Sequence, residues 1–324
     1  MYKEYVFLMV ALIDELEKVV ISINKIDKLY DVHKFVIIVP QKDLLTFRNR
    51  FKTNLNVHIV NENLVVDKDN FYDLCDRDLK NKKDFNFFRK NWYYQQVLKL
   101  TYTLNDKFFT NHNFVMWDAD TIPIRKIKFF NKKNEPINYG SFYEYHLPYF
   151  EHNKIIFGNK YKPYKFAATI QFFALNLQDR KDFRDLLLNF NLKNNIANSN
   201  LFVADAIIKG IKIQNKGNSI KGQLVSEQEL VGAFIFQKYK RSNKDQHLIR
   251  FFRFDVDGYL SAFQNLILFI FNYKHVTYES YFDLKKKQSY KHLIKALIRD
   301  NLVRNNKSYN KFNNIINVLN KFLR

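Results

Sequence analysis

Two carboxylates, Asp118 and Asp120, stand directly after the apolar run 114–117. An apolar run of this length that ends in polar residues predicts a buried strand. Side chains alternate along a strand, so the two carboxylates are expected to project from one side of it. Oxygen ligands suit Mg²⁺ and Mn²⁺, and Mg²⁺ is often held by one or two carboxylates together with substrate phosphates. The pattern therefore predicts a divalent-cation site, although an Asp-x-Asp sequence is also common in turns and at helix caps.

A helix predicted over residues 91–105 carries polar side chains that could face the same site. Its apolar residues recur at helical spacing and form one face. Trp92, Gln96 and Lys99 fall together on another face. Two interpretations are open: a half-buried helix with a polar edge, or a helix whose Gln96 or Lys99 points at a bound ligand.

Two later segments carry acids in suggestive positions. Glu144 and His146 are spaced i, i+2 and share a face if the segment is extended, but a buried ion pair or a hydrogen-bonded structural histidine also explains them. In the segment 226–232, Ser226 suits a helix N-cap, and Glu229 suits the third helical position of a capping box. Glu227 can then face a cleft while Glu229 caps the helix.

Four motifs occur in one order along the chain: Trp-Tyr-x-Gln-Gln-x-x-Lys at 92–99, Asp-x-Asp at 118–120, Glu-x-His-x-Pro-Tyr at 144–149 and Ser-Glu-x-Glu-Leu-x-Gly at 226–232. With them the chain resembles the GT-A fold glycosyltransferases, and more narrowly the bacterial enzymes that assemble surface polysaccharides such as capsule or lipooligosaccharide. The resemblance covers residues 3–255, and the sequence departs from the family after residue 255.

The resemblance implies a hexosyltransferase-type enzyme with a nucleotide-sugar donor, a glycan or glycolipid acceptor, and Mn²⁺ or Mg²⁺ as cofactor. Asp120 would hold the metal, and Asp118 the metal or the donor ribose. The remaining implied roles are donor binding for Trp92, Gln96 and Lys99, acceptor binding for Glu144, His146 and Tyr149, and a third metal ligand from His247 or, second, His275. Lys99 and Arg125 are candidates for the donor diphosphate.

The chemistry of sugar transfer explains why such residues are needed. Negative charge builds on the departing nucleoside diphosphate, and a divalent cation bridging its phosphates neutralises that charge. If the reaction inverts the anomeric centre, a carboxylate must take the acceptor proton, for which Glu227 and Glu229 are the candidates. A reaction that retains configuration needs no base at that place, and the sequence leaves both outcomes open.

The elements around these residues predict an α/β fold. Strands are expected at 5–13, 35–39 and 57–60, and helices at 14–30 and 44–51, which is the start of a doubly wound sheet. Residues 67–90 are expected to form a charged surface loop. A strand is expected within 166–177, with helices at 182–190 and 200–211. The fold class is then a GT-A-like mixed sheet flanked by helices. No Gly-x-Gly-x-x-Gly or Gly-Lys-Ser/Thr loop occurs, which disfavours a Rossmann dehydrogenase and a P-loop NTPase.

The composition predicts a folded chain with a sizeable core and fits a reducing cytoplasm. The chain has 324 residues, 47% of them hydrophobic, and the single cysteine, Cys75, cannot form an intrachain disulfide. We expect a catalytic domain over residues 1–255 and a helical region over 256–324, with no secretory signal and no apolar run of membrane-spanning length. The expected location is the cytoplasm.

The net charge of +21 is unevenly distributed. From Lys285 onward there are eleven Lys or Arg and one acid, Asp300, on two predicted amphipathic helices. Such helices can lie on an anionic membrane, which would make the protein peripheral on the inner face of the cytoplasmic membrane. They can equally bury their apolar stripes on the catalytic domain.

Three other functions compete with sugar transfer. A nucleic-acid-binding protein would use the positive charge, but no zinc-finger spacing or RNA-recognition signature occurs and the Asp-x-Asp strand end stays unexplained, so no nucleic-acid partner is expected. A nucleotidyltransferase needs the same carboxylates and metal, and differs by releasing pyrophosphate. A scaffold protein with a decayed site is disfavoured because both aspartates are present.

Overall fold

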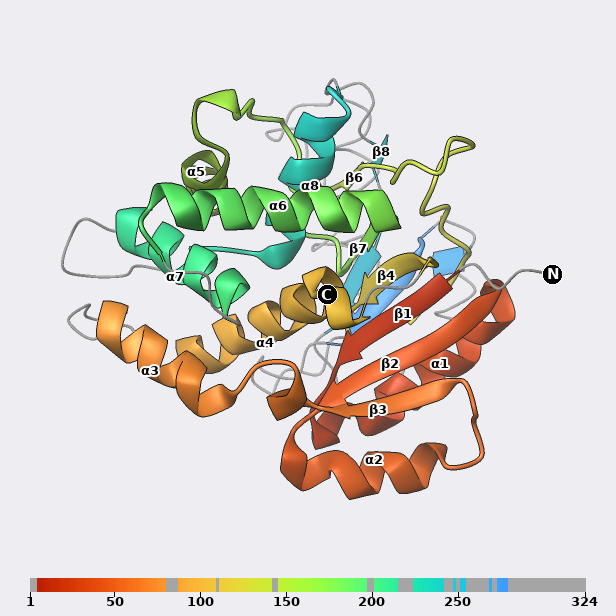
Figure 1. Ribbon diagram of the computed structural model, residues 1–324. Coiled ribbons are helices and arrows are strands. Elements are labelled where there is room, and N and C mark those ends of the chain that lie inside the picture. Colours follow the sequence, from red (N-terminus) through yellow and green to blue (C-terminus); the bar gives the residue numbers. More distant parts are fainter. Residues whose placement is uncertain are drawn as a thin grey trace, which may run out of the picture.

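The computed structural model describes residues 5–79, 87–108, 111–141, 145–196, 201–214, 224–241, 247–248, 251–254, 268–269 and 273–278. The first elements alternate strand and helix, as predicted (Figure 1). They are β1 (Tyr5–Val10), α1 (Leu16–Leu29), β2 (Val32–Val39), α2 (Leu44–Phe51) and β3 (Val57–Asn61). The three strands pair in parallel, which requires the helices to serve as crossover connections.

Two further strands complete the main sheet. β4 (Asn113–Trp117) lies parallel to β1 on the side away from β2, and β7 (Phe172–Leu175) lies antiparallel to β4. The strand order is β3-β2-β1-β4-β7. The predicted mixed α/β sheet flanked by helices is therefore confirmed. Because the chain leaves β1 toward β2 and later returns on its other side to form β4, the order of the strands reverses between β1 and β4.

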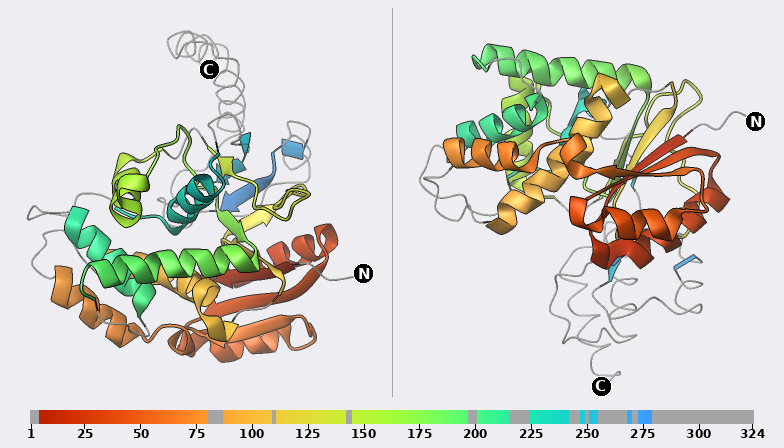
Figure 2. Two further views of the ribbon diagram at one scale, coloured as in Figure 1. Left: turned by 45° about the horizontal axis from the view of Figure 1, so that its top comes forward. Right: turned by 60° about the horizontal axis from the view of Figure 1, so that its bottom comes forward.

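Helices cover both faces of this sheet (Figure 2). Along β1, Phe7 and Met9 point to the face that carries α1 and α2, and Leu8 and Val10 point to the opposite face. That opposite face carries α3 (Lys68–Leu79), α4 (Phe87–Leu104), α6 (Leu177–Lys193), α7 (Phe202–Gln214) and α8 (Glu227–Lys238). The central strands are hydrophobic on both sides because both sides are covered.

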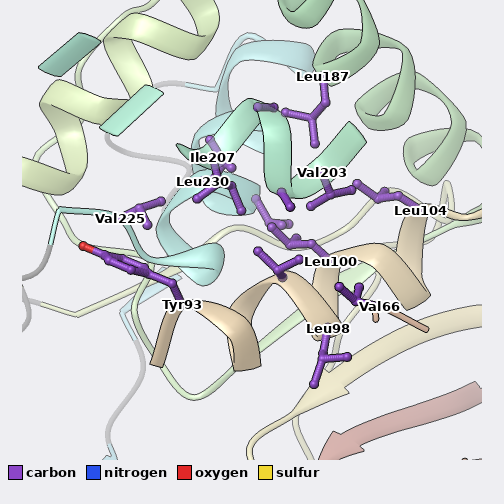
Figure 3. Close-up of a cluster of buried hydrophobic side chains, with 14 of the residues drawn as sticks. Val66, Tyr93, Leu98, Leu100, Leu104, Leu187, Val203, Ile207, Val225 and Leu230 are labelled. Carbon is purple, nitrogen blue, oxygen red and sulfur yellow. The ribbon is translucent and has the colours of Figure 1, made fainter. Parts of the chain in front are cut away.

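The helical layer is held by aliphatic side chains that converge from four helices (Figure 3). These are Leu100 and Leu104 of α4, Leu187 of α6, Val203 and Ile207 of α7, and Leu230 of α8, each buried. Each fully buried side chain of this size stabilises the fold by roughly 1.5–3 kcal/mol relative to exposure. This packing fixes α4 against α8, the two helices that carry the polar motifs.

Helix α3 corrects one prediction. Residues 67–90 were expected to be a surface loop, yet 68–79 are helical. Phe71, Leu74, Cys75 and Leu79 recur at helical spacing and are buried, whereas the remaining positions are mostly charged. These four apolar residues are enough to hold the helix on the protein, because α3 contacts α4 and α7 only along one narrow stripe.

A second sheet joins distant parts of the chain. β5 (Thr121–Pro123) pairs antiparallel with β10 (His275–Tyr278), which pairs in parallel with β9 (Phe251–Phe254). Strand β10, which lies beyond the predicted domain boundary at 255/256, thus belongs to the same small sheet as β5, the strand that follows Asp118 and Asp120. The predicted helices of 284–324 lie outside the described residues. Within the described part of the chain, no helix combines the length and the apolar character needed to cross a bilayer.

Candidate functional site

The polar residues of interest gather at the carboxyl ends of β1 and β4. In open α/β sheets, ligands bind outside the carboxyl ends of the strands, at the point where the strand order reverses. That point lies between β1 and β4 in this sheet. Asp118 follows β4 directly, and Glu15 follows β1 within one short 3₁₀ turn, Ile13–Glu15. The topology therefore places the Asp-x-Asp motif where this fold class binds ligands.

The motif itself is a turn and not the end of a straight strand. The Thr121 amide donates to the Asp118 carbonyl at 3.0 Å, which reverses the chain over Asp118–Thr121 before β5 begins. The Thr121 carbonyl accepts bonds from Trp117 Nε1 at 2.8 Å and Ser22 Oγ at 2.9 Å. The expectation that Asp118 and Asp120 share one face of a strand is thus wrong, and the buried anchors of Thr121 fix where the turn lies.

Both carboxylate oxygens of Asp118 have side-chain partners. Lys99 Nζ donates to Oδ1 at 2.6 Å, and Gln228 Nε2 donates to Oδ2 at 2.8 Å. The Asp118 amide donates to the Gln171 carbonyl at 3.0 Å. Asp118 is consequently fixed by α4, by α8 and by the segment that leads into β7.

Lys99 joins two of the predicted site carboxylates. Its ammonium also donates to Glu227 Oε1 at 2.8 Å, and its side chain is only 6% exposed. Burial lowers the pKa of Lys99, but the carboxylates of Asp118 and Glu227 outweigh burial, so this pKa lies above its ordinary value. The structure thus brings together three predicted residues from α4, the β4 turn and α8 in one ion-paired network.

Gln96 belongs to the same network. Its Oε1 accepts the Glu227 amide at 3.1 Å, and its residue exposure is 2%. Its Nε2 is buried and has no hydrogen-bond partner within the described part of the chain. A buried amide nitrogen without a partner costs stability, and a ligand oxygen could satisfy it.

Glu229 lies apart from this network, inside the protein. It is 0% exposed; Oε2 accepts the Ala168 amide at 2.7 Å and Oε1 accepts the Tyr164 hydroxyl. Burial raises the pKa of Glu229 to about 7, against the opposing effect of these bonds. Ser226 does cap α8, as predicted, but the Glu229 carboxylate does not turn back to complete a capping box. The structure therefore does not bring Glu229, predicted as a candidate base, into the network of Lys99, Asp118 and Glu227.

Asp120 is fixed by the far end of the chain. Its carbonyl accepts the Tyr278 amide at 2.9 Å, and its Oδ1 accepts the Thr121 hydroxyl at 3.3 Å. Lys18 of α1 donates to the Tyr278 carbonyl at 2.9 Å. Strand β10 therefore ties the Asp-x-Asp turn to the start of α1.

The remaining predicted residues lie elsewhere. Trp92 packs beside an aromatic cluster of α5 (Leu147–Phe157) and α8. His146 is the N-cap of α5, and its ring lies edge-on to buried Tyr149 at 4.6 Å, so this segment is not extended as expected. Glu144 lies outside the described residues.

Among the described residues, Arg125 and His275 have partners other than the two aspartates. Arg125 stacks on the ring of Phe269 at 3.6 Å. His275 is buried between the rings of Trp117 and Phe172, a structural place for a histidine. The backbone of His247 pairs with Tyr139, and its side chain lies outside the described residues.

Carboxylate oxygens such as those of Asp118 and Asp120 are of the kind that Mg²⁺ accepts, usually together with substrate phosphates and water. Among the described residues, no group of three or more His, Cys, Asp or Glu side chains is placed to hold a metal without such help. Sequence reasoning missed two residues here. Gln228 lies inside the 226–232 motif but was passed over between two acids. Glu15 follows β1; burial raises its pKa, and it interacts electrostatically with Lys18, Lys99 and Asp118.

Comparison with known proteins adds one family match and three similar solved structures. A family of unknown function, DUF6492, matches residues 13–134, and no curated protein matches the chain. Mouse xyloside xylosyltransferase 1, in its apo form, is similar at 9% identity and a TM-score of 0.45, over 85% of this chain and 97% of that chain. Galactosyltransferase LgtC, in complex with donor and acceptor sugar analogs, is similar at 7% identity and a TM-score of 0.36, over 85% and 87%. The PaToxG glycosyltransferase is similar at 15% identity and a TM-score of 0.31, over 64% and 68%. At such identities a likeness of fold does not carry function.

Proposed function

We propose that this protein is a glycosyltransferase that transfers a sugar from a nucleotide-sugar to a glycan or glycolipid acceptor of a bacterial surface polysaccharide. One observation carries the proposal: the Asp118–Asp120 turn lies at the carboxyl end of β4, at the strand-order reversal, within reach of the buried cation of Lys99. The four motifs that resemble surface-polysaccharide enzymes support the choice of acceptor class.

In this proposal Asp118 and Asp120 hold Mn²⁺ or Mg²⁺ together with the donor diphosphate. The bound cation supplies Lewis-acid neutralisation of the departing nucleoside diphosphate. Lys99 has a separate task, because its hydrogen bonds to Asp118 and Glu227 hold both carboxylates in position. Gln96 Nε2 is the donor within this network that a ligand hydroxyl could satisfy.

The proton acceptor of an inverting reaction is assigned to Glu227. It lies in the same network as Asp118 through Lys99, whereas Glu229 faces Tyr164 and backbone amides. A base must come within hydrogen-bond reach of the proton it takes, and only Glu227 of the two meets the site. His146 and Tyr149 remain proposed acceptor-side residues, at the start of α5.

The test begins with binding. The melting temperature of the protein is measured with a series of nucleotide-sugars, with and without Mn²⁺. One donor class should raise it, because a ligand that binds only the folded state stabilises that state. Incubation of that donor with acceptor glycolipids should release free nucleoside diphosphate. Release of pyrophosphate would assign a nucleotidyltransferase instead, and tight, salt-sensitive binding to mixed DNA or RNA without donor binding would overturn the proposal.

The proposed role of the Asp-x-Asp motif is tested with Asp120→Ala. It should abolish transfer with an unchanged melting temperature, since the backbone bond to Tyr278 does not depend on the side chain. Asp118→Ala should be nearly as damaging to transfer. Full wild-type activity in the presence of a chelator would contradict the metal role of both aspartates.

A further inference from the structure

Three consecutive side chains at the start of α8 reach three different parts of the molecule. Glu227 binds Lys99 of α4. Gln228 donates to Asp118, and its Oε1 accepts the amides of Ile170 and Gln171, both at 2.8 Å. Glu229 accepts the Ala168 amide, and a further bond from the Thr169 amide lowers its pKa against the larger effect of burial. Successive helical residues point about 100° apart, so one helix end can serve all three.

The segment Ala168–Gln171, which we call the strap, is thus held by its own backbone amides. Gln228 and Glu229 together accept from all four of them. The strap ends in Gln171, whose φ of 71° is unusual for a residue with a side chain. Its carbonyl then receives the Asp118 amide at 3.0 Å. The strap therefore connects the interior of α8 to the backbone of the Asp-x-Asp turn.

Helix α8 also approaches the strap unusually closely. A Cβ atom placed on Gly232 would lie 2.1 Å from Cβ of Ala168, a distance that real Cβ atoms do not tolerate. Gly232 is one turn after Gln228 on the same side of the helix. The motif Ser-Glu-x-Glu-Leu-x-Gly thus has a common structural purpose: the cap begins the helix, the side chains bind the strap, and the glycine lets it lie close.

We propose that Glu229 is a positioning residue, whose buried carboxylate holds the strap so that the strap and Gln228 set the backbone and side chain of Asp118. This inference rests on the proposed function only for its kinetic readout. In this inference Glu229 takes no proton from the acceptor and instead holds the strap that positions Asp118. The titratable side chains that interact with Glu229 are Tyr164 and Tyr161, so within the described residues no cation is paired with it there.

Two substitutions separate positioning from acid–base chemistry. In Glu229→Gln, the amide oxygen can accept from Ala168 and the amide nitrogen can donate to the Tyr164 hydroxyl, so the strap stays held. In Glu229→Ala, the bonds from the Ala168 amide, the Thr169 amide and the Tyr164 hydroxyl are all lost. A positioning role predicts near-native turnover for the Gln variant and loss for the Ala variant, whereas a general base predicts a loss of about 10²–10⁴-fold for both.

The direct measurement is amide hydrogen exchange of the full-length protein over residues 168–171. Glu229→Ala should speed exchange there by about tenfold or more, as expected when the hydrogen-bond acceptor of these amides is removed, and Glu229→Gln should not. Asp179→Ala is the matched control: this acid is also 0% exposed, and it binds Lys238 and Tyr239 at the other end of α8. It should destabilise the protein without selective exchange in the strap.

The kinetic measurement uses the donor and acceptor found in the binding screen. Glu229→Ala should lower kcat with a smaller effect on the donor KM, because Asp118 is still present but misplaced. Unchanged strap exchange in Glu229→Ala would overturn the inference even if the protein is a glycosyltransferase. Faster strap exchange without any transferase activity in the wild type would instead leave the strap assignment standing and overturn the proposed function.

Discussion

At the scale of single residues, the buried ammonium of Lys99 decides whether the site can exist. Without it, the carboxylates of Asp118 and Glu227 lose their shared cation in a place with little water. Removing one partner from a buried ion pair typically costs about 3–5 kcal/mol. We therefore predict that Lys99→Met lowers the free energy of unfolding by about this amount, measured by urea denaturation.

Lys238→Met provides the comparison for that experiment. Lys238 also bridges two carboxylates, Asp179 and Asp182, but its side chain is 24% exposed. Water then screens the interaction, and the loss should be clearly smaller. Equal losses in the two variants would show that the Lys99 network has no special dependence on burial.

Glu229 makes the stability of the fold depend on pH. Burial raises its pKa from 4.5 to about 7, so the folded state favours the neutral acid. The stabilisation is fully present below about pH 4.5 and is lost as the pH rises through about 7, by an amount on the order of 3 kcal/mol. We predict that Glu229→Gln, which cannot ionise, unfolds at a higher urea concentration than the wild type at pH 8, and that this advantage disappears near pH 5. A difference that does not change with pH would contradict the assignment.

At the scale of elements, the contact between α8 and the strap can be tested by exchanging two small residues. Gly232→Ala forces a methyl group against Ala168 and should lower both stability and turnover, although alanine favours a helix by about 1 kcal/mol over glycine. Ala168→Gly removes the opposing methyl. We predict that the double variant recovers most of the loss, measured by thermal unfolding and strap hydrogen exchange. If the double variant is as damaged as the sum of the single ones, the two residues do not meet.

Elements with their own local signal were predictable from the sequence. β1 and β2 are apolar runs, α2 was predicted with its observed bounds, and Ser226 does cap α8. The errors arose where distant contacts decide the structure. The Asp118–Thr121 turn depends on Trp117 and Ser22, and β10 becomes a strand only by pairing with β5 and β9.

The candidate site also has parts that the sequence predicts and parts that it does not. Asp118, Lys99, Gln96 and Glu227 were predicted because their motifs have recognisable letters, and the structure does bring them together. The strap has no motif, since its contribution is made by backbone amides that any residue except proline supplies. Glu229 was a candidate base because it lies in the same motif as Glu227. Its complete burial, which the motif does not reveal, favours a positioning role instead.

At the scale of the whole molecule, the basic C-terminal segment predicts that the protein binds anionic membranes. Residues 284–324 follow β10 in the sequence, and the Tyr278 amide of β10 donates to the Asp120 carbonyl. Each basic residue near an anionic surface can add about 1 kcal/mol to binding at low salt. We predict that the full chain co-sediments with anionic liposomes, and that a chain ending at residue 283, which keeps β10, does not. Equal binding by both chains would place the membrane contact elsewhere.

The bond between Asp120 and Tyr278 also bears on how the protein is made. The Lys18–Tyr278 contact spans 260 positions of sequence. Strand β5 also needs β10, which contains Tyr278, as its pairing partner. Contacts of such separation form late, after the loop between them has been closed at an entropic cost. A chain that is still being synthesised can pair β1, β2 and β3 early, yet its Asp-x-Asp turn lacks its last support until residue 278 has been added. We therefore expect the proposed donor binding to appear only after residue 278 has been synthesised, which would keep shorter nascent chains from sequestering nucleotide-sugars.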